Sequence, residues 1–202
     1  ESDIQTEEES SLYATSTGQL STSGGSESVR SLNRKLLPQL ISGRQPVTRG
    51  LIQKAIGLKE IPNVPQAKII GAEDHQTFRT EKLELIVEGE VKIPAILFIP
   101  SNHFESKKVI LYSSSFKESG DPDIRELMQA GHIVMTVDPR GVGESYRPPT
   151  KSGYTQPYQL SARAILLGRN LVEMQTADLL SAISYLANHP RTGNRKITLT
   201  VK

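Results

Sequence analysis

Two short runs of apolar residues constrain the fold of this chain more than any other feature of its sequence. Residues 109–112 (VILY) and 132–137 (HIVMTV) are almost wholly apolar, which is typical of strands buried on both faces of a sheet. Between them, residues 121–130 carry apolar residues at helical spacing and predict a helix that ends at Gly131. Buried strands that alternate with helices predict a three-layer α/β sheet with right-handed crossovers.

The flanking segments extend this pattern in both directions. Residues 80–87 alternate apolar and polar side chains, and residues 91–99 return as an apolar strand after a glycine turn, so the two predict a β-hairpin. Pro94 in the second strand predicts an edge position or a bulge, because proline cannot donate to a sheet ladder. On the other side, residues 162–188 predict two helices and residues 196–201 (KITLTV) predict a last strand.

The chain divides into three segments by composition. Residues 1–27 are mostly Ser, Thr, Glu and Gly, and such a segment cannot bury enough apolar surface to offset its ordering entropy, so we expect it to be disordered. Residues 28–65 predict a basic helical arm, with two short helices separated by Pro46 and Gly50. We expect residues 66–202 to belong to the α/β domain, and the arm to pack on the outside of its sheet.

Charge is distributed unevenly, although the formal net charge is only +2. Residues 1–30 hold six acidic residues and one base, whereas the stretch from residue 28 to residue 59 contains bases and no acid. We interpret this basic stretch as a solvated surface or as a clamp on an acidic neighbouring face; a regulatory interaction of tail and arm is a weaker hypothesis. Nucleic acid is not an expected partner, because the stretch has no aromatic residue to stack on bases.

The composition excludes several kinds of site. The chain contains no cysteine, so it has no disulfide, no thiolate metal site and no cysteine nucleophile. No run of about eighteen apolar residues occurs, and we predict no membrane span. No set of His, Asp and Glu has metal-ligand spacing, so neither a metal nor another cofactor is expected. The Ser/Thr/Glu-rich start favours a secreted or periplasmic location, after removal of a signal, over a cytoplasmic one.

Chemistry is expected beyond the carboxyl ends of the strands, where ligands gather in open parallel sheets. One such place is the loop at 113–117 (SSSFK), and the other is the turn at 138–145 (DPRGVGES). The glycines of this turn allow backbone conformations closed to other residues, and its charged residues can pair with each other or bind loop amides. A structural turn is favoured over direct catalysis. The turn residues concerned are Asp138, Arg140, Gly141 and Gly143.

The turn DPRGVGES resembles the D-x-R-G-x-G-x-S turn after the fourth strand of the serine α/β-hydrolases. The wider run is similar too: VILYSSS, a helix, AGHIVMTVDPRGVGES, a long insertion, then ILLGRNLVEMQTADLLSAISYLANHPRTGNRKITLTVK. Within that fold the chain is similar to the acetyl xylan esterases and related bacterial carboxylesterases, in which an L-L-G-R-x-L-like stretch precedes a helix ending in Y-L. The resemblance covers roughly residues 60–202.

The resemblance implies that the catalytic residues lie elsewhere. In this fold the nucleophile elbow, G-x-S-x-G, follows the fifth strand, and the acid and the histidine come later. The strand at 196–201 matches that fifth strand, and G-x-S-x-G occurs nowhere in the 202 residues. The expected triad therefore lies beyond Lys202, and this N-terminal portion alone is expected to be inactive. The histidines that precede the expected elbow, and so are not expected to act as the base, are His75, His103, His132 and His189.

The resemblance also implies one element of the oxyanion hole. In serine hydrolases of this fold, one backbone amide comes from the loop after the third strand, and here Ser115 or Phe116 would supply the N–H. Relatives often have a His-Gly pair at this point, whereas this chain has serines, and an ordinary turn is the alternative. Asp138 and Arg140 would shape the rim of the active site.

The expected activity is hydrolysis of acyl or acetyl esters, on small molecules or carbohydrates, through an acyl-enzyme. Peptidase or dienelactone-hydrolase chemistry is the nearest alternative within the fold. A non-catalytic binding or assembly module, built on a partial hydrolase fold, is the alternative from another class. The strand at 196–201 is expected to pair beside the strand at 109–112 and to leave its far edge free, which predicts self-association through this last strand.

Overall fold

The computed structural model describes residues 6–19, 22–23, 25, 27–44, 46–101, 108–113, 121–146, 153–192 and 195–201. Contacts divide the chain into two units, residues 1–48 and residues 49–202. No helix in these described ranges is both long enough and apolar enough to cross a membrane.

The first unit contains a short 3-10 helix, η1 (Glu9–Leu12), and one α-helix, α1 (Val29–Ser42). Ser28 caps α1, because its hydroxyl accepts the Ser31 N–H while the Ser31 hydroxyl accepts the Ser28 N–H. All the residues of α1 remain outside any core. The helix agrees with the first of the two helices predicted for the basic arm, and disorder of residues 1–27 stays a prediction.

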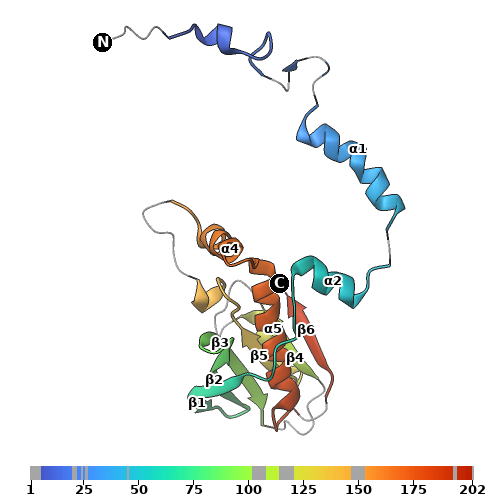
Figure 1. The fold of residues 1–202 in the computed structure, drawn as a ribbon. Helices are drawn as coiled ribbons and strands as arrows, with labels where there is room; N and C mark the ends of the chain where they lie inside the picture. Colours follow the sequence, from blue (N-terminus) through green and yellow to red (C-terminus); the bar gives the residue numbers. More distant parts are fainter. Residues whose placement is uncertain are drawn as a thin grey trace. The chain divides into compact units, whose positions relative to one another are not determined.

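The second unit is built on a six-stranded mixed sheet with the strand order β1-β2-β3-β5-β4-β6 (Figure 1). β1, β2 and β3 form an antiparallel meander that pairs antiparallel with β5, whereas β4, β5 and β6 run parallel. The α/β class, the hairpin and the pairing of the last strand beside β4 are therefore confirmed. The strands are β1 (Gln66–Asp74), β2 (Phe78–Val87), β3 (Val91–Pro100), β4 (Val109–Ser113), β5 (Ile133–Val137) and β6 (Ile197–Val201).

Helices cover both faces of this sheet and complete three layers. On one face, Ala182 and Leu186 of α5 pack into the main core with alternate residues of β2, β3, β4 and β5. On the other face, Ile124 of α3 packs against Phe98, Tyr112 and neighbouring residues. Because both faces are covered, every residue of β4 and of β5 is buried, as their apolar runs predicted. The helices are α2 (Arg49–Ile56), α3 (Pro122–Gln129), η4 (Gly143–Ser145), α4 (Gln156–Leu166) and α5 (Leu171–Asn188).

The prediction for Pro94 is wrong. β3 lies inside the sheet, between β2 and β5, and Pro94 pairs with Glu84 in an uninterrupted register. Its carbonyl accepts the Asp138 N–H at 3.0 Å, so an N–H at position 94 would have pointed to the Asp138 carbonyl. That carbonyl accepts the Ser145 hydroxyl instead, at 3.3 Å. An internal proline is tolerated here because a loop side chain replaces the donor that proline lacks.

Three further features, one strand and the limits of two helices, differ from the sequence-based expectation. β1 was not predicted; it is an edge strand whose Ile69 and Ile70 are both exposed, so it carries no burial alternation. Gly50 does not separate the two arm helices, because it is the second residue of α2. α4 begins at Gln156, six residues before the predicted start, since the polar residues of its first turns form helix without contributing an apolar stripe.

Candidate active site

The carboxyl ends of β4, β5 and β6 lie at one edge of the sheet. The register sets Tyr112 opposite Thr136 and sets Ser113 opposite Val201. The chain leaves β4 toward β5 on one side and returns to β6 on the other, so the strand order reverses at β4. Ligands bind at such switch points in open α/β sheets. The candidate site therefore lies at the carboxyl ends of β4 and β6.

Ser115 and Phe116, the predicted oxyanion-hole donors, lie outside the described residues. Ser113, the last described residue before them, is buried at the end of β4. Its position opposite Val201 places the end of β4 at the switch point. The donor role of the two amides stays a prediction.

Asp138 binds a loop amide, which is one of the two roles predicted for it. It directly follows β5, is 3% exposed, and its Oδ2 accepts the N–H of Glu144 at 3.0 Å. Its backbone N–H and carbonyl are also bonded, to Pro94 and to Ser145. The carboxylate thus folds the turn after β5 back onto the end of that strand.

Gly141 and Gly143 both have the left-handed backbone that favours glycine, with φ of +77° and +53°. A Cβ atom at Gly143 would lie 2.3 Å from Asp138 Cγ, and one at Gly141 would lie 2.7 Å from Leu160 Cδ1 of α4. The prediction that these glycines adopt conformations closed to other residues is confirmed. Close approach by a carboxylate at one glycine and by α4 at the other adds a second reason for the missing side chains.

Arg140 pairs with another element rather than with Asp138. Its Nη2 lies 2.7 Å from Oδ1 of Asp178, and its Nε lies 3.0 Å from Oδ2. The backbone N–H of Arg140 also donates to Asp178, at 3.0 Å, and its carbonyl accepts the Gln175 side-chain amide at 2.9 Å. Asp178 is completely buried on α5. Side chain and backbone together therefore attach the turn after β5 to the helix behind it.

A wider ionic cluster surrounds this pair. Glu88, in the hairpin turn between β2 and β3, accepts from Arg140 at 2.8 Å and from Arg169 at 2.8 Å. Arg169 also donates to Glu173 of α5, at 2.7 Å. Arg169 first, and Arg140 second, lower the pKa of Glu88 to about 2. Hydrogen bonds to Glu173 and Glu88 raise the pKa of Arg169 above its ordinary value.

Sequence reasoning did not find this cluster, which we call the Glu88 cluster (Glu88, Arg140, Arg169, Glu173 and Asp178). One signal for it was present: Glu173 and Asp178 are charged residues on the buried side of α5, and a buried charge requires a partner. Glu88 gave no such signal, because a glutamate beside a glycine in a turn is typical of an exposed surface residue. Its φ of +46° is the only positive value at a non-glycine position in the described part of the chain.

A cavity of about 760 Å³ borders the Glu88 cluster. Its walls come from residues 57–66, from the hairpin turn and from the start of α5. Among the charged residues that line it, those of the Glu88 cluster pair with one another, whereas Lys59 and Glu60 are exposed at its wall.

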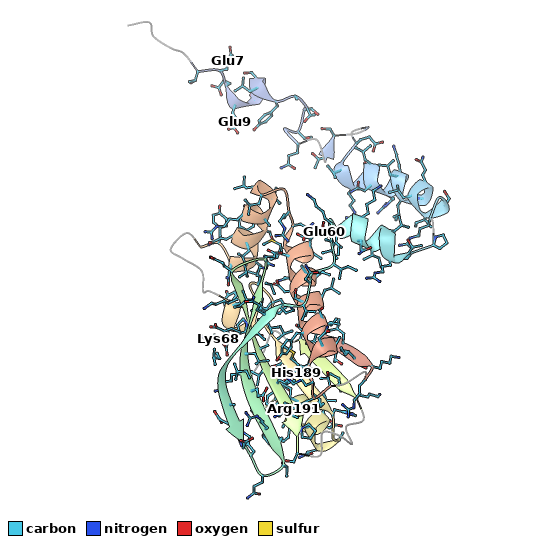
Figure 2. The ribbon with its side chains drawn as sticks, turned by 60° about the horizontal axis from the view of Figure 1, so that its bottom comes forward. Glu7, Glu9, Glu60, Lys68, His189 and Arg191 are labelled. Carbon is cyan, nitrogen blue, oxygen red and sulfur yellow. The ribbon has the colours of Figure 1, made fainter. Side chains whose placement is uncertain are left out.

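The histidines that the structure describes lie at the opposite edge of the sheet. His132 directly precedes β5, His75 lies in the turn that leads into β2, and His189 ends α5. β2 is parallel to β5, so His75 and His132 both lie at the amino ends of these strands. The end of α5 lies at the same edge, because Arg191 pairs with Glu81 near the start of β2. Figure 2 shows His189 and Arg191 together there, away from α4. Burial lowers the pKa of His189. His103 lies outside the described residues.

Comparison with known proteins identifies this architecture. No family model and no curated protein matches the sequence, but solved structures match the fold. A protein described as an acetyl xylan esterase from Bacteroides fragilis NCTC 9343 superposes with a TM-score of 0.63 at 16% identity, over 76% of this chain and 46% of that chain. The fold is that of the α/β-hydrolases.

Two further esterase structures agree with this α/β-hydrolase assignment. Acetyl xylan esterase 1 from Thermoanaerobacterium sp. JW/SL YS485 matches with a TM-score of 0.51 at 18% identity, over 68% of this chain and 44% of that chain. A methylesterase matches with a TM-score of 0.50 at 13% identity, over 85% of this chain and 40% of that chain. This chain thus spans less than half the length of each of these three structures.

Proposed function

We propose that this chain is the N-terminal part of a serine esterase that hydrolyses acyl or acetyl esters, among them esters of carbohydrates, through an acyl-enzyme. The observation that carries the proposal is the pairing of Ser113 with Val201 at the switch point of the sheet. The esterase-like fold supports it, since the matched structures include acetyl xylan esterases and a methylesterase.

The geometry suits acyl transfer because two neighbouring strands end together. In the α/β-hydrolase fold, the nucleophilic serine lies on a sharp strand-to-helix turn at the carboxyl edge, and an adjacent loop supplies an oxyanion-hole amide. β6 lies directly beside β4, so a serine after β6 would face the amides after Ser113. The serine would attack the ester carbonyl, the amides would stabilise the oxyanion, the alcohol would leave, and water would release the acid.

We place the nucleophile, the acid and the histidine outside these 202 residues. G-x-S-x-G does not occur in the sequence. Moreover, the described histidines lie at the amino edge, and a general base must lie within hydrogen-bond reach of the group that it deprotonates.

In this proposal the turn after β5 forms a rigid rim of the active site. Arg140 is bonded to α5 through its guanidinium, its N–H and its carbonyl, while Asp138 binds the amide of Glu144. Both residues therefore act by holding the turn in place, because an active site needs its supporting loops fixed to within a fraction of an ångström.

The test compares two purified proteins: this chain, and the same chain continued through the codons that follow it in its reading frame. With p-nitrophenyl acetate, we expect saturable hydrolysis by the longer protein, inhibited by a serine-directed sulfonyl fluoride, and none by the 202-residue chain. Alanine at the serine of a downstream G-x-S-x-G is the control and should abolish activity. Saturable, inhibitor-sensitive hydrolysis by the 202-residue chain would refute the placement of the triad, and a reading frame without G-x-S-x-G would favour a non-catalytic module.

A further inference from the structure

Two exposed tyrosines stack on each other at the beginning of α4. The rings of Tyr154 and Tyr158 have centroids 4.9 Å apart and planes 20° from parallel. The two residues are 57% and 59% exposed. The Gln159 side-chain amide donates to the Tyr154 carbonyl at 3.1 Å, which fixes the backbone that carries the first ring. The pair is therefore an ordered aromatic surface in contact with solvent.

This surface is attached to the rim of the candidate active site. The Gln156 side-chain amide donates to the carbonyl of Ser145 at 3.2 Å, and Ser145 belongs to the turn after β5. Leu160 packs so closely on Gly141 of the same turn that a Cβ atom there would be 2.7 Å from its Cδ1. In Figure 1, α4 accordingly lies at the end of the sheet toward which β6 runs. The helix that carries the tyrosine pair is thus attached to the turn after β5, at the carboxyl edge of the sheet.

The residues beside the rings in the sequence are mostly polar, although α4 also carries one charged residue, Arg163, and exposes Ile165 and Leu166 in its last turn. Residues 153–162 (GYTQPYQLSA) contain no acidic and no basic residue, but they supply amide and hydroxyl groups beside the tyrosines. Aromatic rings bind the C–H face of a sugar ring by burying apolar surface, and neighbouring amides and hydroxyls suit its hydroxyl groups. A nucleic acid would instead require several Lys or Arg side chains for its phosphates, and α4 has only Arg163. The combination fits a neutral carbohydrate.

We propose that Tyr154 and Tyr158 form a stacking platform that binds the carbohydrate portion of the ester beside the active-site rim. The choice of a carbohydrate ester rests on the proposed function, whereas binding to the platform does not require the catalytic triad. A tyrosine side chain loses little conformational entropy on binding, and this pair is already held in place, so the platform is preorganised.

Binding can be measured on the 202-residue chain. The chain has no tryptophan, so its intrinsic fluorescence comes from its tyrosines. Titration with xylohexaose should change this fluorescence saturably, and isothermal titration calorimetry should give the same dissociation constant. We expect Tyr154→Ala and Tyr158→Ala each to weaken binding by about fivefold, the order expected for the loss of one aromatic contact. Tyr158→Phe keeps the ring and should bind nearly as well as the parent chain.

The matched control is Tyr13→Ala, because Tyr13 is also an exposed tyrosine (46%) but belongs to the first unit. It should leave binding unchanged. Far-UV circular dichroism checks that each variant is folded. The proposal is overturned if the parent chain does not bind xylohexaose, if the double variant Y154A/Y158A binds as well as the parent, or if single-stranded oligothymidylate binds more tightly at the same residues.

These outcomes are distinct from failure of the proposed function. Xylohexaose binding that depends on the two tyrosines, together with no esterase activity in the extended chain, would refute the esterase and retain the platform. Serine-dependent hydrolysis by the extended chain, without binding of xylohexaose to the platform, would refute the platform and retain the esterase.

Discussion

The carboxylate of Asp138 occupies the space in which a side chain at position 143 would lie: a Cβ atom on Gly143 would be 2.3 Å from Asp138 Cγ and 2.4 Å from both carboxylate oxygens. The same carboxylate accepts the N–H of the next residue, Glu144, at 3.0 Å. Asp138 and Gly143 therefore depend on each other, because the Asp138 carboxylate can reach the N–H of Glu144 only if residue 143 has no side chain.

Gly143→Ala should destabilise the second unit by about 2 kcal/mol or more, since the new methyl group displaces a buried carboxylate and alanine disfavours positive φ. Urea unfolding followed by circular dichroism measures the loss. Gly131→Ala is the matched control: Gly131 also has a positive φ, of +81°, but nothing lies within 4 Å of its added Cβ. Gly131→Ala should lower the free energy of unfolding by only about 1 kcal/mol, the cost of placing alanine at a positive φ. Equal losses for the two variants would contradict the role given to Asp138.

Asp178→Asn should destabilise the second unit by about 3 kcal/mol, because it leaves the guanidinium of Arg140, whose side chain is only 13% exposed, without its main counter-charge. Chemical denaturation provides the measurement. Glu84→Gln breaks a more exposed pair, with Lys92 at 3.3 Å, and should change stability by less than about 0.5 kcal/mol. An Asp178→Asn variant as stable as the parent chain would show that the pair does not anchor the turn.

Glu88 should make stability depend on acid pH. Arg169 and Arg140 lower its folded-state pKa to about 2, from an ordinary value of 4.5. A lowered carboxyl pKa means that the stabilisation is complete above about pH 4.5 and is lost progressively as the pH falls toward 2. Urea unfolding between pH 3.5 and 7 should therefore show that Glu88→Gln is less stable than the parent at neutral pH and that the difference narrows below about pH 4.5.

Glu90→Gln serves as the control for this pH dependence, because Glu90 is an exposed carboxylate of the same hairpin turn. The difference between this variant and the parent should stay nearly constant over the same pH range. A Glu88→Gln difference that does not change with pH would mean that the ion pairs of Glu88 contribute nothing to folding.

The 202-residue chain should self-associate through β6. In the described part of the sheet β6 pairs only with β4, and its Leu199 and Val201 are 45% and 66% exposed. An apolar strand with a free edge is a template for pairing with another chain. Light scattering during size exclusion should detect oligomers at tens of micromolar, and Leu199→Lys should shift them toward monomer. Ile69→Lys, on the opposite edge strand, should do so less; a monomeric parent chain would refute the prediction.

Local patterns in the sequence predicted most of the second unit. The apolar runs of β4 and β5, the hairpin, α3 and the glycine turn follow from short-range periodicity and backbone preference, which act within a few residues. The edge strand β1 was missed because an exposed strand has no burial pattern; it exists only because β2 offers it a hydrogen-bonding partner. Pro94 was misplaced because the hydroxyl that compensates for its missing N–H belongs to Ser145, more than fifty residues away.

By itself, the sequence determined that the chain folds as an α/β sheet and that G-x-S-x-G is missing from it. It also determined which polar turns follow the strands. Only the tertiary structure decided that Ser113 lies opposite Val201, that Arg140 pairs with Asp178 rather than Asp138, and that the described histidines lie at the far edge. The physical reason is range: hydrophobic periodicity and turn preference are properties of neighbouring residues, whereas strand order and ion pairing depend on which distant segments the packed core brings together.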